Sequence, residues 1–245
     1  MRRYGLIGRP LGHSASAAYF AAKFEREGIA DCAYALYELP DIGALEGLLA
    51  RTPDLCGFNV TIPYKREVMP LLDALSHDAW MIGAVNCVRR AADGSLTGHN
   101  TDVVGLRASL DELLGGEQPE HALVLGTGGA SQAVQYVLAE RGIPFDLVSR
   151  DTANGNYTYD DLPCEVVERS RLIVNASPVG TYPAVDAAPR IPYGFVTPGH
   201  YLLDLVYNPP LTQFLDYGRQ RGAHILNGET MLREQAEASW RIWNE

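Results

Sequence analysis

The chain has 245 residues, of which 47% are hydrophobic and 20% charged, a composition that excludes a disordered protein and suits one or two globular domains. Its formal net charge of −10 at pH 7 comes without a basic cluster, which argues against nucleic acid and anionic membrane as partners. The four cysteines are widely spaced and the six histidines lack metal-ligand spacing, which predicts reduced thiols, a cytoplasmic location and no metal site. No apolar run is long enough for a signal peptide or a membrane span.

Short apolar runs alternate with helical patterns through the first hundred residues. In chain order they predict a strand at Tyr4–Gly8, a helix at His13–Glu27, a strand at Tyr34–Leu39, a helix at Ile42–Ala50, a strand at Cys56–Val60, short helices at Met69–Asp73 and Asp78–Met81, and paired strands at Ala84–Arg90 and Ser95–Gly98.

A more regular alternation follows, from a helix at Asp102–Leu114 to a final amphipathic helix at Glu229–Trp243. Between them we expect strands at Leu123–Leu125, Phe145–Arg150, Arg171–Asn175, Tyr201–Val206 and Ala223–Leu226. Strands that alternate with helices and loops predict a parallel sheet.

Lysine is rare in this chain, because only two of its 20 Lys and Arg residues are lysines. One of the two, Lys65, closes the segment Gly57–Lys65 beside Asn59 and Thr61. A lysine can give up its proton when its surroundings lower its pKa, whereas arginine cannot. Lys65 is therefore a candidate for proton transfer; the alternative is a surface lysine at a helix start, which Pro63 would suit.

The apolar run Leu123–Leu125 ends in a glycine-rich turn, and a helical pattern follows it. Strand, turn and helix form the first half of a dinucleotide-binding unit. Gly126 would permit the tight turn, Gly128 the approach of a pyrophosphate, and Ala130 close packing of the helix, whose N-terminus attracts phosphate.

The next strand ends in Arg150, where NAD-binding units usually carry Asp or Glu. An arginine there suits the 2′-phosphate of NADP, so the sequence predicts NADP as the cofactor. Two alternatives remain open: Arg150 is an ordinary surface charge, or Asp151 faces inward and repels the phosphate.

Several motifs occur together in one order along the chain. They are His13–Ser16, Gly57–Lys65, Gly83–Asn86, Gly98–Asp102, Gly126–Ser131, Asn175–Gly180, Asp204–Pro209, Asn227-Gly228 and Gln235-Ala236. In these motifs and their spacing, the chain resembles the shikimate dehydrogenases from Gly5 to the C-terminal helix.

The resemblance implies an α/β fold of two domains. Residues 1–101 would form an α/β substrate-binding domain, with the helix at 229–245 packing back onto it. Residues 102–228 would form a Rossmann-like, doubly wound NADP-binding domain. The implied reaction is the reversible, NADPH-dependent reduction of 3-dehydroshikimate to shikimate, on the route to chorismate and the aromatic amino acids, by a monomer or homodimer.

The resemblance also implies the site residues. Lys65 and Asp102 would be catalytic. The substrate would be held by Ser14, Ser16, Asn59, Thr61, Asn86, Tyr207 and Gln235. The cofactor would be held by Gly126, Thr127, Gly128, Gly129, Ala130, Ser149, Arg150, Leu205 and Gly228.

Plainer roles exist for some of these residues. Ser14, Ser16 and Asp102 could be helix caps, Asn59 and Asn86 turn residues, and Gln235 an exposed helix position. Three other functions also remain open: an NAD-linked quinate/shikimate dehydrogenase, a non-catalytic relative that binds shikimate or nucleotide, and a dehydrogenase of the methylenetetrahydrofolate type. The Ser14/Ser16 pair argues against the last, and the presence of Lys65 and Asp102 against the second.

Overall fold

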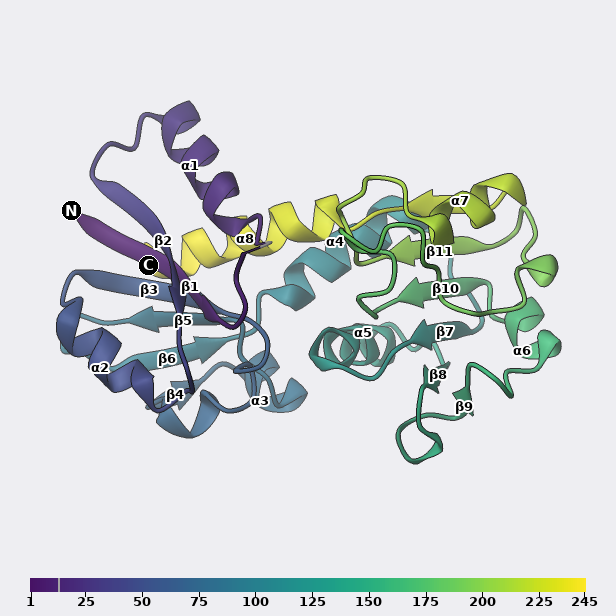
Figure 1. The fold of residues 1–245 in the computed structure, drawn as a ribbon, viewed down its shortest axis with the longest axis horizontal. Helices are drawn as coiled ribbons and strands as arrows, with labels where there is room; N and C mark the ends of the chain where they lie inside the picture. Colours follow the sequence, from purple (N-terminus) through teal and green to yellow (C-terminus); the bar gives the residue numbers. More distant parts are fainter. Residues whose placement is uncertain (13) are drawn as a thin grey trace. The chain divides into compact units, whose positions relative to one another are not determined.

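Figure 1 shows the computed structural model, which describes residues 1–12 and 14–245. The chain divides into two compact units, one of residues 1–101 with 235–245 and the other of residues 102–234. The sequence placed the divisions after residues 101 and 228. The second division lies later because the first turn of the last helix joins the second unit, where the Thr230 hydroxyl donates to Glu112 over 2.7 Å.

The first unit contains a six-stranded mixed sheet in the order β2-β1-β3-β5-β6-β4. Its strands are β1 Arg2–Gly8, β2 Cys32–Glu38, β3 Leu55–Val60, β4 Ala74–Leu75, β5 Cys87–Arg90 and β6 Leu96–His99. Strand β1 pairs in parallel with β2 and β3, whereas β5 is antiparallel to both β3 and β6. The predicted pairing through Asp93-Gly94 is confirmed, because the Gly94 N–H bonds to the Ala91 carbonyl in the β5–β6 turn.

The helices of this unit are α1 Ser16–Glu27, α2 Ala44–Arg51 and α3 His77–Ile82, with a 3₁₀ turn η1 at Met69–Leu71. Helix α1 was predicted from His13, which lies outside the described residues. Its described part begins at Ser16, after the N-cap residue Ala15.

Two apolar clusters cover the two faces of the first sheet, as the alternation of side chains along a strand requires. Ile7 and Phe58 pack with Leu45 and Leu48 of α2 in one cluster. The other cluster joins Tyr4 to Phe20 and Phe24 of α1 and to Trp243 of α8 (Glu229–Trp243).

Trp243 fixes the end of α8 on the sheet. Its indole N–H donates to the Val88 carbonyl over 3.0 Å, and its ring stacks on Tyr4 with centroids 4.9 Å apart. Gly57 makes room for the indole, since a Cβ at that position would lie 2.2 Å from Trp243 Cδ1.

Gly57→Ala is therefore expected to lower the free energy of unfolding by about 1–3 kcal/mol, the usual cost of forcing a methyl group into a packed core. Urea unfolding of the variant measures this. Gly12→Ala is the matched control, because a Cβ at Gly12 meets no atom within 4 Å. Equal stability of both variants would show that α8 can shift away from β3 without cost.

The second unit contains a parallel sheet in the order β12-β11-β10-β7-β8-β9, which confirms the predicted parallel arrangement. Its strands are β7 Ala122–Leu125, β8 Phe145–Ser149, β9 Tyr157–Thr158, β10 Leu172–Asn175, β11 Tyr201–Asp204 and β12 His224–Leu226. Its helices are α4 Asp102–Leu114, α5 Gly129–Glu140, α6 Cys164–Arg169 and α7 Gln213–Gln220, with 3₁₀ turns η2 Thr152–Asn154 and η3 Tyr193–Phe195. In the described part of the chain no helix combines the length and apolar character that crossing a membrane requires.

A fully buried aspartate, Asp204, ends β11 and holds the loop that follows. One oxygen accepts from the Asn175 amide at 2.9 Å and the Val206 N–H at 3.0 Å, and the other accepts from the Thr212 hydroxyl at 2.5 Å. Burial raises the pKa of Asp204 to about 6, although these hydrogen bonds each act to lower it.

Asp204 therefore makes stability depend on pH in an unusual direction. Its folded-state pKa lies above the unfolded value of about 3.9, so the folded protein binds the proton more tightly and its stability falls as pH rises through 6. Relative to the wild type, Asp204→Asn should become more stable by about 1–2 kcal/mol between pH 5 and pH 8. Urea unfolding of both proteins across this range measures the difference, and a constant difference would contradict the raised pKa.

Candidate active site

The segment after β3 presents Lys65 from a turn anchored on both sides. The Thr61 N–H bonds to the Ile7 carbonyl at 2.9 Å, and the buried Tyr64 donates its hydroxyl to the Leu39 carbonyl at 2.7 Å. The carbonyl of Lys65 accepts from the Val85 N–H at 2.8 Å. Lys65 is half-buried, so the turn fixes its backbone while its side chain is still partly accessible.

Asn59, at the end of β3, is buried within a polar network. Its amide oxygen accepts from the Tyr34 hydroxyl at 2.9 Å, and its amide nitrogen donates to the Asn86 carbonyl at 3.1 Å and to the Ser239 hydroxyl at 2.9 Å. Burial raises the pKa of Tyr34, while a hydrogen bond with Ser16 acts to lower it. The phenol thus stays protonated and can donate to Asn59.

Asn86 is the link between this network and Asp102. Its amide oxygen accepts from the Thr101 N–H at 2.6 Å and lies 3.2 Å from the Thr101 hydroxyl. Its backbone N–H donates to the His99 carbonyl at 3.0 Å. These bonds orient the amide and hold the backbone that leads into Asp102, the buried first residue of α4. A carboxylate in the first turn also suits the positive end of that helix.

Ser14 and Ser16 flank the start of α1 without serving as its N-cap. That position is Ala15, with no side-chain capping bond, and the Ser14 hydroxyl accepts from the Ser16 N–H at 3.3 Å. Both serines are half-buried. Neither serine hydroxyl is therefore occupied by a capping bond of the usual geometry, as binding of a carboxylate would require.

The glycine-rich turn of the second unit has the form that its sequence predicts. Gly126 adopts a positive φ of 105°, and its N–H bonds to the Val148 carbonyl at 2.8 Å. Helix α5 begins at Gly129 after Gly128, next to which a Cβ would meet no atom within 4 Å. Open space beside Gly128 and the free N–H groups of a helix start fit a pyrophosphate.

The other predicted cofactor residues lie at the carboxyl ends of three strands of the parallel sheet, β8, β11 and β12. Ser149 ends β8, and its hydroxyl lies 3.4 Å from that of Thr127. Leu205 follows β11 and bonds through its N–H to the Asn175 carbonyl at 3.0 Å. Gly228 lies against Leu205, because a Cβ at Gly228 would lie 2.3 Å from the Leu205 carbonyl oxygen. Half-buried Tyr207 stands two residues beyond Leu205, also in the second unit.

Arg150 is exposed at the end of β8, and Asp151 does not compete with it. The Asp151 carboxylate caps η2, accepting from the Ala153 N–H at 2.9 Å and from the Asn154 amide at 3.5 Å. Capping therefore gives the Asp151 carboxylate local partners in η2.

The sequence did not single out Tyr34 or Ser239 as part of the site, although both contact Asn59. Gln235, which it did single out, lies one turn before Ser239 on α8, and its carbonyl accepts the Ser239 hydroxyl at 2.9 Å. The one sequence signal for Ser239 was a polar residue on the buried face of the final amphipathic helix. Among the described residues, no group of three or more His, Cys, Asp and Glu side chains could hold a metal ion.

Comparisons with known proteins agree with this arrangement. A family model described as the shikimate dehydrogenase substrate binding domain matches residues 6–88. A curated relative, the shikimate dehydrogenase (NADP(+)) of Halothermothrix orenii, is 36% identical across 98% of this chain and 89% of its own length.

Two solved structures show the same fold. The shikimate 5-dehydrogenase of Thermus thermophilus in complex with NADP(H) and shikimate is 32% identical, with a TM-score of 0.85 over 99% of this chain and 93% of that one. The quinate dehydrogenase of Corynebacterium glutamicum in complex with NAD is 29% identical, with a TM-score of 0.88 over the same shares. The chain thus belongs to the shikimate dehydrogenase family.

Proposed function

We propose that this chain catalyses the reversible, NADP-dependent interconversion of shikimate and 3-dehydroshikimate. The observation that carries the proposal is the buried network of the first unit, which links Asn59 to Asn86 and Asn86 to Thr101, the residue before Asp102. This network lies in the unit that matches the family's substrate-binding domain. Curated relatives with identities of 31–36% over nearly the whole chain carry the same activity in their names.

The substrate is a small carboxylate that carries ring hydroxyls. The hydroxyls of Ser14 and Ser16 supply neutral donors for the carboxylate, with Thr61, Tyr207 and Gln235 as further contacts that the family pattern gives. Asn86, whose amide oxygen accepts from Thr101, is suited to a ring hydroxyl because its amide nitrogen can donate to one. The amide of Asn59 bonds to Tyr34, Asn86 and Ser239. Its bond to the Asn86 carbonyl holds the backbone of Asn86 in place.

In the direction of reduction, bound NADPH supplies the hydride. Lys65 donates the proton that the carbonyl oxygen of the substrate requires as it becomes a hydroxyl, and takes that proton back in the reverse direction. Asp102 orients the reacting hydroxyl and the lysine, so that the proton moves between fixed positions. A lysine suits this task because its ammonium can lose a proton, whereas a guanidinium cannot.

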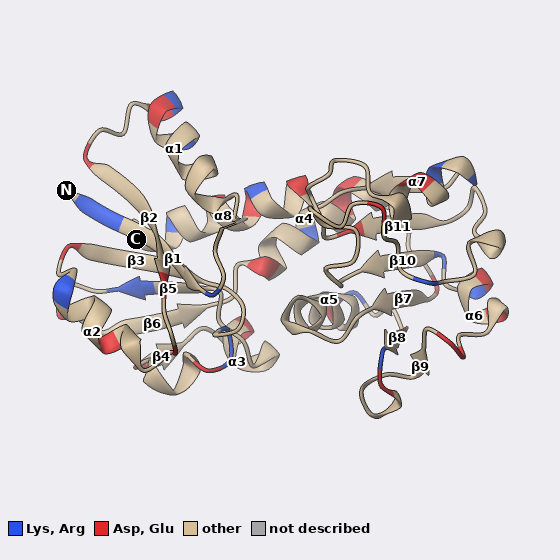
Figure 2. Ribbon diagram, viewed as in Figure 1, with Lys and Arg blue, Asp and Glu red and all other residues tan. Residues whose placement is uncertain are grey.

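The residues proposed to bind the dinucleotide all lie in the second unit. Gly126, Thr127, Gly128, Gly129 and Ala130 form a turn with open space at the start of α5. Ser149 and Arg150 would hold the adenosine end, with Arg150 on the 2′-phosphate, and Leu205 and Gly228 would lie at the nicotinamide end. The acidic and basic residues are interspersed in both units (Figure 2), so specific donors hold these anions instead of a general positive field. The proposal includes a cytoplasmic monomer or homodimer, and all four cysteines are free thiols.

One spectrophotometric experiment tests the function. Purified protein is given shikimate or quinate, each with NADP or NAD, and reduced cofactor is followed over time. We expect the highest kcat/KM with shikimate and NADP. The quinate dehydrogenase named above, with its bound NAD, makes quinate with NAD the specific competing pair. Preference for that pair would contradict the proposal, and no reaction with any pair would indicate a non-catalytic relative.

Replacement of Lys65 tests its role in proton transfer. Lys65→Ala should lower kcat by about 10²–10⁴-fold, the usual contribution of a general acid or base, with the KM for shikimate largely kept. Lys65→Arg should lose nearly as much, because arginine keeps the charge but not the exchangeable proton. Steady-state kinetics of both variants provide the measurement.

The control is Arg66→Ala, which removes the neighbouring exposed cation and should leave kcat near the wild-type value. Near-normal turnover of Lys65→Arg would show that only the positive charge matters. Near-normal turnover of Lys65→Ala would remove Lys65 from the mechanism.

Replacement of Arg150 tests the choice of cofactor. Arg150→Ala should weaken NADP binding by about ten- to a hundredfold, the worth of a hydrogen bond to a charged group, and leave NAD binding nearly unchanged. Arg169→Ala is the matched control, because it also removes an arginine charge near β8 but at the other end of the strand. There the Arg169 guanidinium lies 2.6 Å from the Asp146 carboxylate. Titration calorimetry with both cofactors provides the measurement, and equal weakening of NADP and NAD would refute the assignment.

A further inference from the structure

Ser239 joins three segments of the first unit that carry the proposed site. It is fully buried on α8. Its hydroxyl accepts from the Asn59 amide at 2.9 Å, lies 3.1 Å from the Thr101 hydroxyl, and is 2.9 Å from the Gln235 carbonyl, to which it can donate. One side chain therefore contacts the end of β3, the entry to Asp102 and the final helix.

The hydrogens of this network can be counted. Ser239 and Thr101 each have one hydroxyl hydrogen, and the Asn59 amide provides another donor. When Ser239 donates to Thr101 in place of the Gln235 carbonyl, Thr101 can donate to the Asn86 amide oxygen 3.2 Å away. A continuous chain of hydrogen bonds then runs from Asn59 through Ser239 and Thr101 to Asn86.

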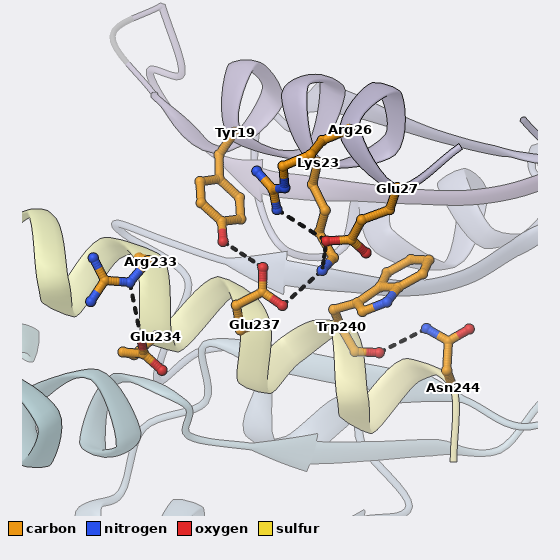
Figure 3. Close-up of polar contacts among 9 residues, drawn as sticks. All are labelled: Tyr19, Lys23, Arg26, Glu27, Arg233, Glu234, Glu237, Trp240 and Asn244. Carbon is orange, nitrogen blue, oxygen red and sulfur yellow. Dashed lines mark hydrogen bonds and ion pairs between the residues drawn. The ribbon is translucent and has the colours of Figure 1, made fainter. Parts of the chain in front are cut away.

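Helix α8 is held firmly on both sides of Ser239. Tyr19 and Lys23 of α1 point toward Glu237, which accepts from them at 2.6 and 2.7 Å (Figure 3). The Lys23 side chain is only 4% exposed. Burial acts to lower the pKa of Lys23, but its bonds to Glu237 and Glu27 outweigh this and raise it, so the ion pair stays charged.

Trp243, one turn after Ser239, is fixed by its bond to the Val88 carbonyl. With Glu237 on one side and Trp243 on the other, the helix has little freedom to rotate. The Ser239 hydroxyl is thus presented to Asn59 and Thr101 at a fixed place.

We propose that Ser239 is a positioning residue for the dehydrogenase reaction. It does not contact substrate. It holds the Asn59 amide and the Thr101 hydroxyl, so that Asn86 keeps one amide orientation and Thr101, the residue before Asp102, is held in one place. This role rests on the proposed function, because Asn86 and Asp102 are assigned through it.

The test compares two buried helical serines. Ser239→Ala removes the hydroxyl that joins the three segments. Ser109→Ala is the matched control, since Ser109 is also fully buried in a helix but its hydroxyl bonds only to the Gly105 carbonyl of its own helix, at 3.0 Å. Thermal unfolding of both variants shows that they are folded and reports any loss of stability.

We expect Ser239→Ala to lower kcat/KM for shikimate by about fivefold or more, as the loss of one net hydrogen bond would, and to leave the KM for NADP unchanged. Thr101→Val should have a similar effect, and the double variant should lose little more than either single one, because both break the same chain. Ser109→Ala should match the wild type. Unchanged kcat/KM in Ser239→Ala, or losses that add fully in the double variant, would overturn the proposal.

A second measurement separates this proposal from the proposed function. In ligand-free protein, NMR of the side-chain amides of Asn59 and Asn86 should show slow hydrogen exchange in the wild type and in Ser109→Ala, and faster exchange in Ser239→Ala. This readout holds even if the wild type does not oxidise shikimate, an outcome that would refute the function alone. Equal exchange in all three proteins would refute the positioning role.

Discussion

The first unit depends on the pairing of the polar atoms of two buried amides, those of Asn59 and Asn86. Asn59 and Asn86 are 5% and 3% exposed, and leaving a buried donor or acceptor without a partner costs about 1–3 kcal/mol. Each amide therefore has one orientation that its neighbours can satisfy. Tyr34, Thr101 and Ser239 supply those neighbours from a strand, a strand-to-helix connection and the final helix. Groups that are already oriented need no reorganisation when a polar substrate binds.

The second unit has a different requirement, because a phosphate-binding turn must leave its backbone N–H groups accessible. Its parallel strands all end at one edge, where a turn with positive φ at Gly126 leads into the start of α5. Asp204 supports the same edge from inside by bonding to Asn175, Val206 and Thr212. Close backbone contact between Leu205 and Gly228 completes the edge. In the proposed function, the cofactor site is made mainly of backbone, and the side chain of Arg150 selects the cofactor.

Much of this could be predicted from the sequence, because the main elements have clear periodicity. The helices at Asp102–Leu114 and Glu229–Trp243 have the predicted bounds. Strands β4 and β9 have only two residues each, and α6 only six, too few to show a period. Helix α1 begins at Ser16, whereas its predicted first residue, His13, lies outside the described residues.

The roles of the motif residues in the site stay predictions, and the network that supports them could not be predicted. Tyr34, Asn59, Thr101 and Ser239 lie far apart in sequence, and only the fold brings them together. The role of Asp151 could not be predicted either, because its capping bonds depend on the turn that follows.

The central claim is that this chain transfers a hydride from shikimate to NADP. The most direct test uses shikimate with deuterium on carbon 3, the carbon that becomes the carbonyl, and mass spectrometry of the reduced cofactor. We predict one deuterium in each NADPH that forms, and a slower turnover than with unlabelled shikimate if this transfer limits the rate. Formation of NADPH without deuterium, or recovery of the labelled shikimate unchanged, would contradict the claim.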